Sequence, residues 1–177
     1  MLRKRPILSL IALTLLLHTP VGLAADSLPA RIKEAEFQSL DGSAPVKLSN
    51  YKGKVVVVAL LASWCPACNS AVKELVVFND EFAGRGVEVV GLTMRSSTTD
   101  AEWISGFAGG TKINFKLGWL SRDAIDNWSS KMKTVPQILV VSGDGKIVKR
   151  FDGWSESVPP QLRETVAKRL ARTPASR

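Results

Sequence analysis

The hydrophobic positions of this chain fall into two kinds of run. Residues 55–63, VVVVALLAS, are apolar at every position but the last, and residues 87–94, VEVVGLTM, are mostly apolar. Continuous β-branched runs of this length are typical of strands that are buried on both faces of a sheet. Between them, apolar side chains recur at three- and four-residue steps from Val72 to Phe82 and stop before Gly84. That spacing predicts a helix between two buried strands.

The flanking segments extend this alternation of strands and helices. Residues 33–54 predict a short N-terminal β-hairpin with its turn at Asp41-Gly42. The other predicted elements, in chain order, are a helix that opens with a capping box at Thr99 and Glu102, a short strand in 113–119, a helix in 121–132, a hairpin of 137–142 with 146–153, and a closing helix in 157–172. The pattern predicts an α/β protein with a central mixed β-sheet flanked by helices on both faces.

The first 24 residues have the three parts of a secretory signal peptide. Basic residues from Arg3 to Arg5 precede an apolar run at 7–17, and the small residues Gly22 and Ala24 follow. We expect cleavage after Ala24, export to the periplasm, and a single domain over residues 25–177. The alternative is an uncleaved membrane anchor, although the apolar run is shorter than the roughly 20 residues that span a bilayer.

Composition narrows the chemistry of this domain. The 177 residues are 45% hydrophobic and 23% charged, which is ordinary for a globular protein, and the formal net charge is +8. Basic residues are spread along the chain rather than clustered, so no nucleic-acid partner is expected. The one histidine, His18, lies in the predicted signal peptide, so the domain itself offers two cysteines and no histidine.

Those two cysteines, Cys65 and Cys68 of SWCPAC, follow the strand at 55–63 and begin the next helix. The free N–H groups and the dipole of a helix N-terminus stabilise a thiolate. We expect Cys65 to be exposed in the turn and Cys68 to be shielded one turn further along. Two intervening residues let the sulfurs meet as a disulfide, so that Cys65 can attack a partner and Cys68 can resolve the mixed disulfide.

Other uses of a cysteine pair fit less well. A structural disulfide across a loop of about four residues stabilises by only roughly 2 kcal/mol. Tetrahedral zinc needs four ligands, which this domain does not supply from cysteine and histidine. Copper(I) binding by the two thiolates stays open as an alternative, with Met94 and Met132 as the nearest downstream methionines. The spacing favours a redox-active pair that needs no cofactor and no metal.

Three stretches together resemble the thioredoxin superfamily, and within it the exported thiol–disulfide oxidoreductases of the TlpA/ResA type. They are SWCPAC after VVVVALLA, TVPQILVV near the C-terminus, and the SGDGKIVKRFDG that follows. The resemblance spans about residues 34–170. It implies a thioredoxin-like fold with an N-terminal β-hairpin and a TlpA-type insertion of a strand and a helix at about 96–118.

The resemblance also implies roles for individual residues. Cys65 is similar to the attacking cysteine and Cys68 to the resolving one, with Trp64 and Pro66 beside them. Pro136 matches a proline that is cis in this superfamily and faces the cysteines. The backbone of Val135 would then pair with a substrate strand next to the disulfide.

Two positions depart from the family pattern. The buried acid that several relatives carry six residues before the first cysteine is Ala59 here, and the Glu that ResA-type proteins often carry three residues after the second cysteine is Ala71. The proton of Cys68 is therefore expected to pass to water or to a carboxylate such as Glu36 or Glu74.

In function, the resemblance implies a periplasmic reductant or shuttle for protein disulfides, kept reduced by a DsbD/CcdA-like membrane electron donor. Apocytochrome c thiols, in cytochrome c maturation, are one substrate class that it suggests. A disulfide-forming oxidant and a non-catalytic module that binds copper(I) or a client protein remain alternatives. A peroxidase of related fold is disfavoured, because its reactive cysteine lies in a different local motif.

Overall fold

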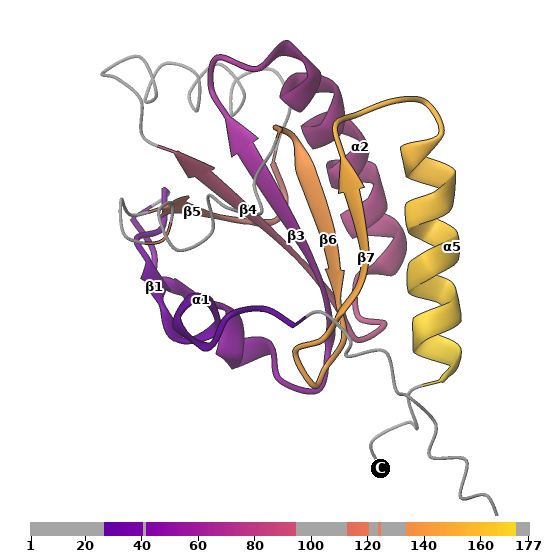
Figure 1. Cartoon of the computed structure of the whole chain (residues 1–177), viewed down its shortest axis with the longest axis horizontal. Coiled ribbons are helices and arrows are strands. Elements are labelled where there is room, and N and C mark those ends of the chain that lie inside the picture. Colours follow the sequence, from indigo (N-terminus) through magenta and orange to yellow (C-terminus); the bar gives the residue numbers. More distant parts are fainter. Residues whose placement is uncertain (1–26, 41, 95–112, 121–123, 125–133, 173–177) are drawn as a thin grey trace, which may run out of the picture.

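A five-stranded mixed sheet forms the centre of the molecule (Figure 1). The computed structural model describes residues 27–40, 42–94, 113–120, 124 and 134–172. In chain order the strands of this sheet are β3 (Val55–Ala62), β4 (Val87–Met94), β5 (Lys116–Leu120), β6 (Gln137–Val141) and β7 (Ile147–Asp152). They lie in the order β5-β4-β3-β6-β7; β4 runs parallel to both its neighbours and β6 antiparallel to both of its own. This confirms the predicted α/β class with a central mixed sheet.

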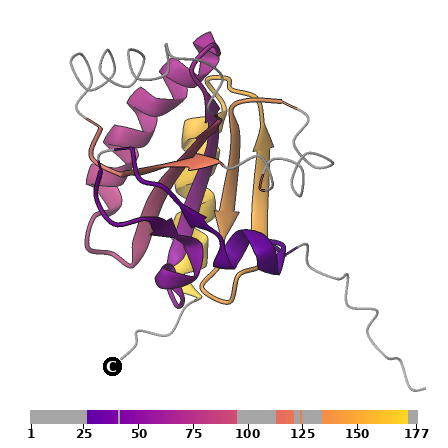
Figure 2. The same cartoon turned by 90° about the vertical axis from the view of Figure 1, so that its left-hand side faces the viewer.

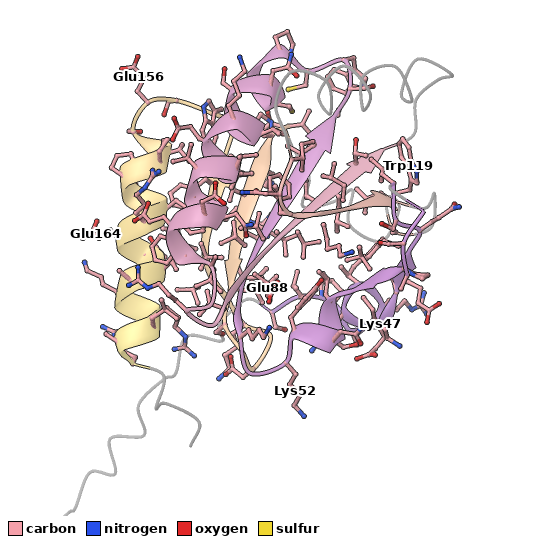
Figure 3. The ribbon with its side chains drawn as sticks, turned by 180° about the vertical axis from the view of Figure 1, so that it is seen from behind. Lys47, Lys52, Glu88, Trp119, Glu156 and Glu164 are labelled. Atoms are coloured by element: carbon pink, nitrogen blue, oxygen red, sulfur yellow. The ribbon has the colours of Figure 1, made fainter. Side chains whose placement is uncertain are left out.

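Strand β3 lies in the middle of the sheet, and all eight of its residues are buried. Helices α2 (Pro66–Phe82) and α5 (Val158–Ala171) cover one face, which Figure 3 shows from the helix side. Helix α1 (Ala30–Glu34) and the 3-10 helix η1 (Leu48–Tyr51) cover the other face (Figure 2). The continuous apolar run of β3 therefore contributes to two apolar layers, one on each face of the sheet.

The predicted N-terminal hairpin is present, but its strands are only two residues long. Strands β1 (Glu36–Phe37) and β2 (Val46–Lys47) pair antiparallel. Leu48, expected in the second strand, opens η1 instead. Leu40 leaves the hairpin pairing, and its N–H donates to the carbonyl of Leu117 at 3.1 Å. The hairpin thus pairs with β5 and covers that edge of the large sheet.

The remaining predictions agree with the structure where the chain is described. Strand β5 is the short strand expected near residue 116, and β6 and β7 form the expected C-terminal hairpin. The predicted helices at Thr99 and in 121–132 lie outside the described residues, apart from a buried Ala124, and so does the predicted signal peptide. Within the described ranges, no helix has the length and apolar character needed to cross a bilayer.

Gly118 lies where the hairpin packs against β5, and a larger residue there has no space. A Cβ on Gly118 would lie 2.8 Å from the Cβ of Phe37, which cannot swing away because it is fixed to the backbone. We predict that Gly118→Ala lowers the free energy of unfolding by about 1–3 kcal/mol, measured by urea denaturation. Lys116→Ala, at an exposed position of the same strand, is the control and should cost under about 0.5 kcal/mol. Equal losses in the two variants would contradict this packing.

Candidate active site

Strand β3 delivers the cysteine pair to the end of the sheet where α2 begins (Figure 1). A turn follows Ala62, closed by the N–H of Cys65, which donates to the Ala62 carbonyl at 3.2 Å. Cys65 is the N-cap of α2, and Pro66 is its first helical residue, where the missing N–H of proline costs nothing. The Sγ of Cys65 accepts a hydrogen bond from the N–H of Cys68 at 3.3 Å. The sulfur thus caps the helix as a Ser or Asp oxygen ordinarily does.

Both cysteines are thiols and both are buried. Cys68 has no exposed surface, as predicted, but Cys65 is only 5% exposed, so the expectation of an exposed Cys65 is wrong. The reason is that capping turns its sulfur back onto the helix, while the backbone before β6 lies against it. Trp64, in contrast, is 62% exposed. A partner protein that approaches this end of the sheet therefore meets the indole beside the thiol.

The segment before β6 completes the site. Its Val135–Pro136 peptide bond is cis, as predicted. The thiol of Cys65 donates to the carbonyl oxygen of Val135 at an Sγ–O distance of 3.5 Å. Strand β6 then pairs with β3, which brings the segment to the cysteines. All six residues that the sequence singled out lie at this end of the sheet or beside it: Trp64, Cys65, Pro66, Cys68, Val135 and Pro136.

The surroundings of Cys68 favour its protonated form. Burial raises the pKa of the Cys68 thiol well above its usual range, and its hydrogen bond with Cys65 raises this pKa further, against a smaller opposing effect of the Ala62 backbone. Neither of the carboxylates named above is among the groups that shift this pKa. Glu36 is exposed on β1, which packs on the opposite face of the sheet, and Glu74 forms an ion pair with Arg163 at 3.7 Å. Neither carboxylate is therefore identified as the acceptor of the Cys68 proton.

Apolar groups fill the layer in which related proteins carry a buried acid. Ala59 is fully buried and lies opposite Gly91 in the parallel pairing of β3 with β4. A Cβ on Gly91 would collide with the side chain of Leu117 and lie 3.3 Å from that of Phe115. Ala71 of α2 is buried as well. A carboxylate at either alanine would be desolvated among apolar side chains.

Two features near the site were missed by sequence reasoning. One is Gln137, a fully buried amide directly after Pro136. In the sequence, the only indication of this residue is that a polar side chain precedes the apolar run ILVV. The other is a groove of about 580 Å³ between α2 and the β7–α5 loop, lined by Ser70, Lys73, Glu74, Trp154, Ser155, Glu156 and Pro159.

Across the described part of the chain, no three His, Cys, Asp or Glu side chains gather as a metal site would require.

Comparison with known proteins agrees with this architecture. The sequence matches the model of the AhpC/TSA family over residues 30–150. Similar solved structures include a thiol:disulfide interchange protein of the thioredoxin family from Chlorobium tepidum, which is 21% identical. The match covers 81% of this chain and 99% of the Chlorobium tepidum chain, with a TM-score of 0.63.

Two further structures are equally similar. A secreted disulfide oxidoreductase from Mycobacterium tuberculosis, described as homologous to Escherichia coli DsbE, is 20% identical over 79% of this chain and 99% of its own, with a TM-score of 0.62. StoA from Bacillus subtilis is 21% identical, and the match covers 77% of this chain and 98% of StoA, also with a TM-score of 0.62. At these identities, the likeness confirms the thioredoxin-like fold that the motifs predicted.

The raised pKa of Cys68 predicts that the reduced protein loses stability in alkali. The unfolded chain releases this proton near the usual thiol pKa of 9.0, whereas the folded protein retains it. The contribution of the protonated Cys68 thiol to the free energy of unfolding is therefore complete below that pH and declines as the pH rises above it. Between about pH 8 and pH 10, the reduced wild type should lose about 1–2 kcal/mol more than Cys68→Ala in urea denaturation. Parallel pH profiles would mean that the folded thiol titrates as it does in the unfolded chain.

Proposed function

Because this chain belongs to the AhpC/TSA family and presents two free thiols at a helix N-terminus, we propose that it is a protein thiol–disulfide oxidoreductase. Its redox-active pair is Cys65 and Cys68. The observation that carries the proposal is the capping contact: Cys65 Sγ lies 3.3 Å from the N–H of Cys68, and the Cys68 thiol is buried directly behind it. The two sulfur atoms of the dithiol carry the two electrons that are transferred, so the proposed reaction needs no cofactor or metal.

The proposed reaction transfers two electrons to a disulfide of a partner protein. The Cys65 thiolate attacks one partner sulfur, forms a mixed disulfide, and releases the other partner sulfur as a thiolate. Cys68 then loses its proton and attacks Cys65 Sγ, which breaks the mixed disulfide and releases the second partner thiolate. The products are the Cys65–Cys68 disulfide and a partner dithiol, and the reverse sequence oxidises the partner.

Each neighbour of Cys65 has a part in this scheme. The N–H of Cys68 and the N-terminus of α2 stabilise the thiolate that attacks. Trp64 would offer its exposed indole to the partner, and the backbone of Val135, which contacts Cys65 Sγ, would pair with a partner strand beside the sulfurs. The released partner thiolate or water accepts the proton of Cys68, since Ala59 and Ala71 replace the acids of related proteins.

The proposed setting is the periplasm, reached through the signal peptide at 1–24. The signal-like pattern of that segment supports this setting, as does the similarity to a protein described as secreted. There the pair would be kept reduced by a DsbD/CcdA-like membrane donor and would reduce exported proteins, apocytochrome c among them. The alternative direction, disulfide formation, uses the same residues and differs only in the reduction potential of the pair.

The reduction potential of the Cys65–Cys68 pair distinguishes these directions. Trp64 adjoins the disulfide and should report its formation by fluorescence in a thiol redox buffer. We predict a potential near or below that of thioredoxin, about −270 mV, as a reductant requires. A potential near that of DsbA, about −120 mV, would make the protein an oxidant. Absence of any reversible transition would support the binding module and contradict the exchange reaction.

Single cysteine variants test the order of attack. We predict that Cys68→Ser accumulates mixed disulfides with partner proteins, because Cys65 can attack but nothing resolves the product. Cys65→Ser should trap none and should not reduce insulin in the presence of dithiothreitol, and the double variant controls for background. The measurement is non-reducing electrophoresis after acid quenching of cells. Trapping by Cys65→Ser rather than Cys68→Ser would reverse the assigned roles.

A further inference from the structure

Gln137 is a buried polar side chain at a point where the proposed reaction needs precise geometry. It is the first residue of β6, it follows Pro136 directly, and its exposed fraction is 0%. Ser39, Thr93 and Ser142 are the other buried polar residues of the described chain, and all are smaller. Burying an amide is unfavourable unless both its oxygen and its nitrogen find partners. The partners of Gln137 therefore indicate what the residue does.

Those partners come from β7, the neighbouring edge strand. The Nε2 of Gln137 donates to Oδ1 of Asp152 at 2.6 Å, and its Oε1 accepts from Nη1 of Arg150 at 3.2 Å. Gln137 lies directly opposite Asp152 in the antiparallel pairing. Next to this contact, the N–H of Gly153 donates to the carbonyl of Pro136 at 2.9 Å. The end of β7 thus holds both the Gln137 side chain and the peptide that precedes it.

The same peptide segment carries the carbonyl that faces the reactive sulfur. Val135 lies two residues before Gln137, and its oxygen is 3.5 Å from Cys65 Sγ. On the other side, Gln137 pairs with Leu60 of β3, which leads on to Cys65. The position of the Val135 carbonyl relative to the sulfur therefore depends on how firmly the start of β6 is held between β3 and β7.

We propose that Gln137 is a positioning residue for thiol–disulfide exchange, holding residues 134–136 through Asp152 and Arg150 so that the Val135 backbone stays over Cys65. The proposal rests on the proposed function. In this position the Val135 oxygen accepts a hydrogen bond from the Cys65 thiol in the resting state, and its lone pairs would repel a thiolate at the same place. The same fixed backbone is ready to pair with a partner strand without first being ordered.

Loosening the segment then has two opposite consequences. The Cys65 thiolate forms more readily when the carbonyl moves away, so alkylation of the thiol accelerates. Partner recognition weakens, because the backbone has to be ordered when the partner binds, so KM rises more than kcat falls. A residue that only satisfied its own hydrogen bonds would change stability alone. Faster alkylation together with weaker recognition is therefore the signature of the positioning role.

The test uses two variants that break the same hydrogen bond from opposite sides. Gln137→Leu removes the amide at nearly constant volume, and Asp152→Ala removes the acceptor at an exposed position where folding tolerates truncation. In a Cys68→Ala background, we expect iodoacetamide at pH 7 to alkylate Cys65 about three- to tenfold faster in each variant. With Cys68 present, KM for insulin should rise by a similar factor of about three to ten, with kcat within about twofold. The double variant should add little to either single one.

Ser142→Ala is the matched control, because Ser142 is a buried polar residue directly after the other end of β6. Its hydroxyl contacts Asp144 and the carbonyl of Lys146, far along the strand from the cysteines. It should lower stability and leave alkylation and KM unchanged. Wild-type rates in both Gln137→Leu and Asp152→Ala, or equal changes in Ser142→Ala, would overturn the proposal. Alkylation does not need a partner protein, so a wild type that fails to reduce insulin would refute the proposed function separately.

Discussion

Strand β3 has to be hydrogen-bonded along both edges and covered on both faces, and the rest of the structure is arranged around this requirement. Strands β4 and β6 supply the edges, and two apolar layers supply the faces. The strand ends at Ala62, where the chain must turn and start a helix whose first N–H groups need acceptors. The sulfur of Cys65 provides one of them. The Cys65 thiol is thus part of the connection between the sheet and helix α2.

This arrangement brings three separate elements to one sulfur atom. The β3–α2 turn positions Cys65, the segment before β6 places the Val135 carbonyl against it, and the end of β7 holds that segment through Gln137 and the Pro136 carbonyl. Each contact is a single hydrogen bond of modest net strength, and together they link the β3–α2 turn, the segment before β6 and the end of β7. The geometry of the site therefore depends on contacts between segments that are distant in sequence.

The apolar character of the site sets its acid–base behaviour. Cys68 lies among buried apolar side chains. The small residues Ala59 and Gly91 leave space that the side chains of Leu117 and Phe115 fill. Burial and the hydrogen bond with Cys65 raise the pKa of the Cys68 thiol, so this thiol holds its proton. In the proposed exchange, the resolving step then depends on the leaving partner thiolate or water. In that scheme Cys65 attacks first, and Cys68 reacts only when a mixed disulfide already lies next to it.

The sequence by itself determined the elements whose causes are local. The buried strand that begins at Val55, the helix that follows it and the place of the cysteines between the two depend on residues close in sequence, and each was predicted; the strand ends at Ala62, one residue before the end of the predicted run. The tertiary structure decided what depends on distant segments. Cys65 is buried because Val135, 70 residues away in sequence, lies against its sulfur. Glu74, which the sequence offered as a proton acceptor, forms an ion pair with Arg163 of α5. Hydrophobic periodicity and capping are properties of neighbouring residues, whereas burial and hydrogen-bond partners are properties of the packed chain.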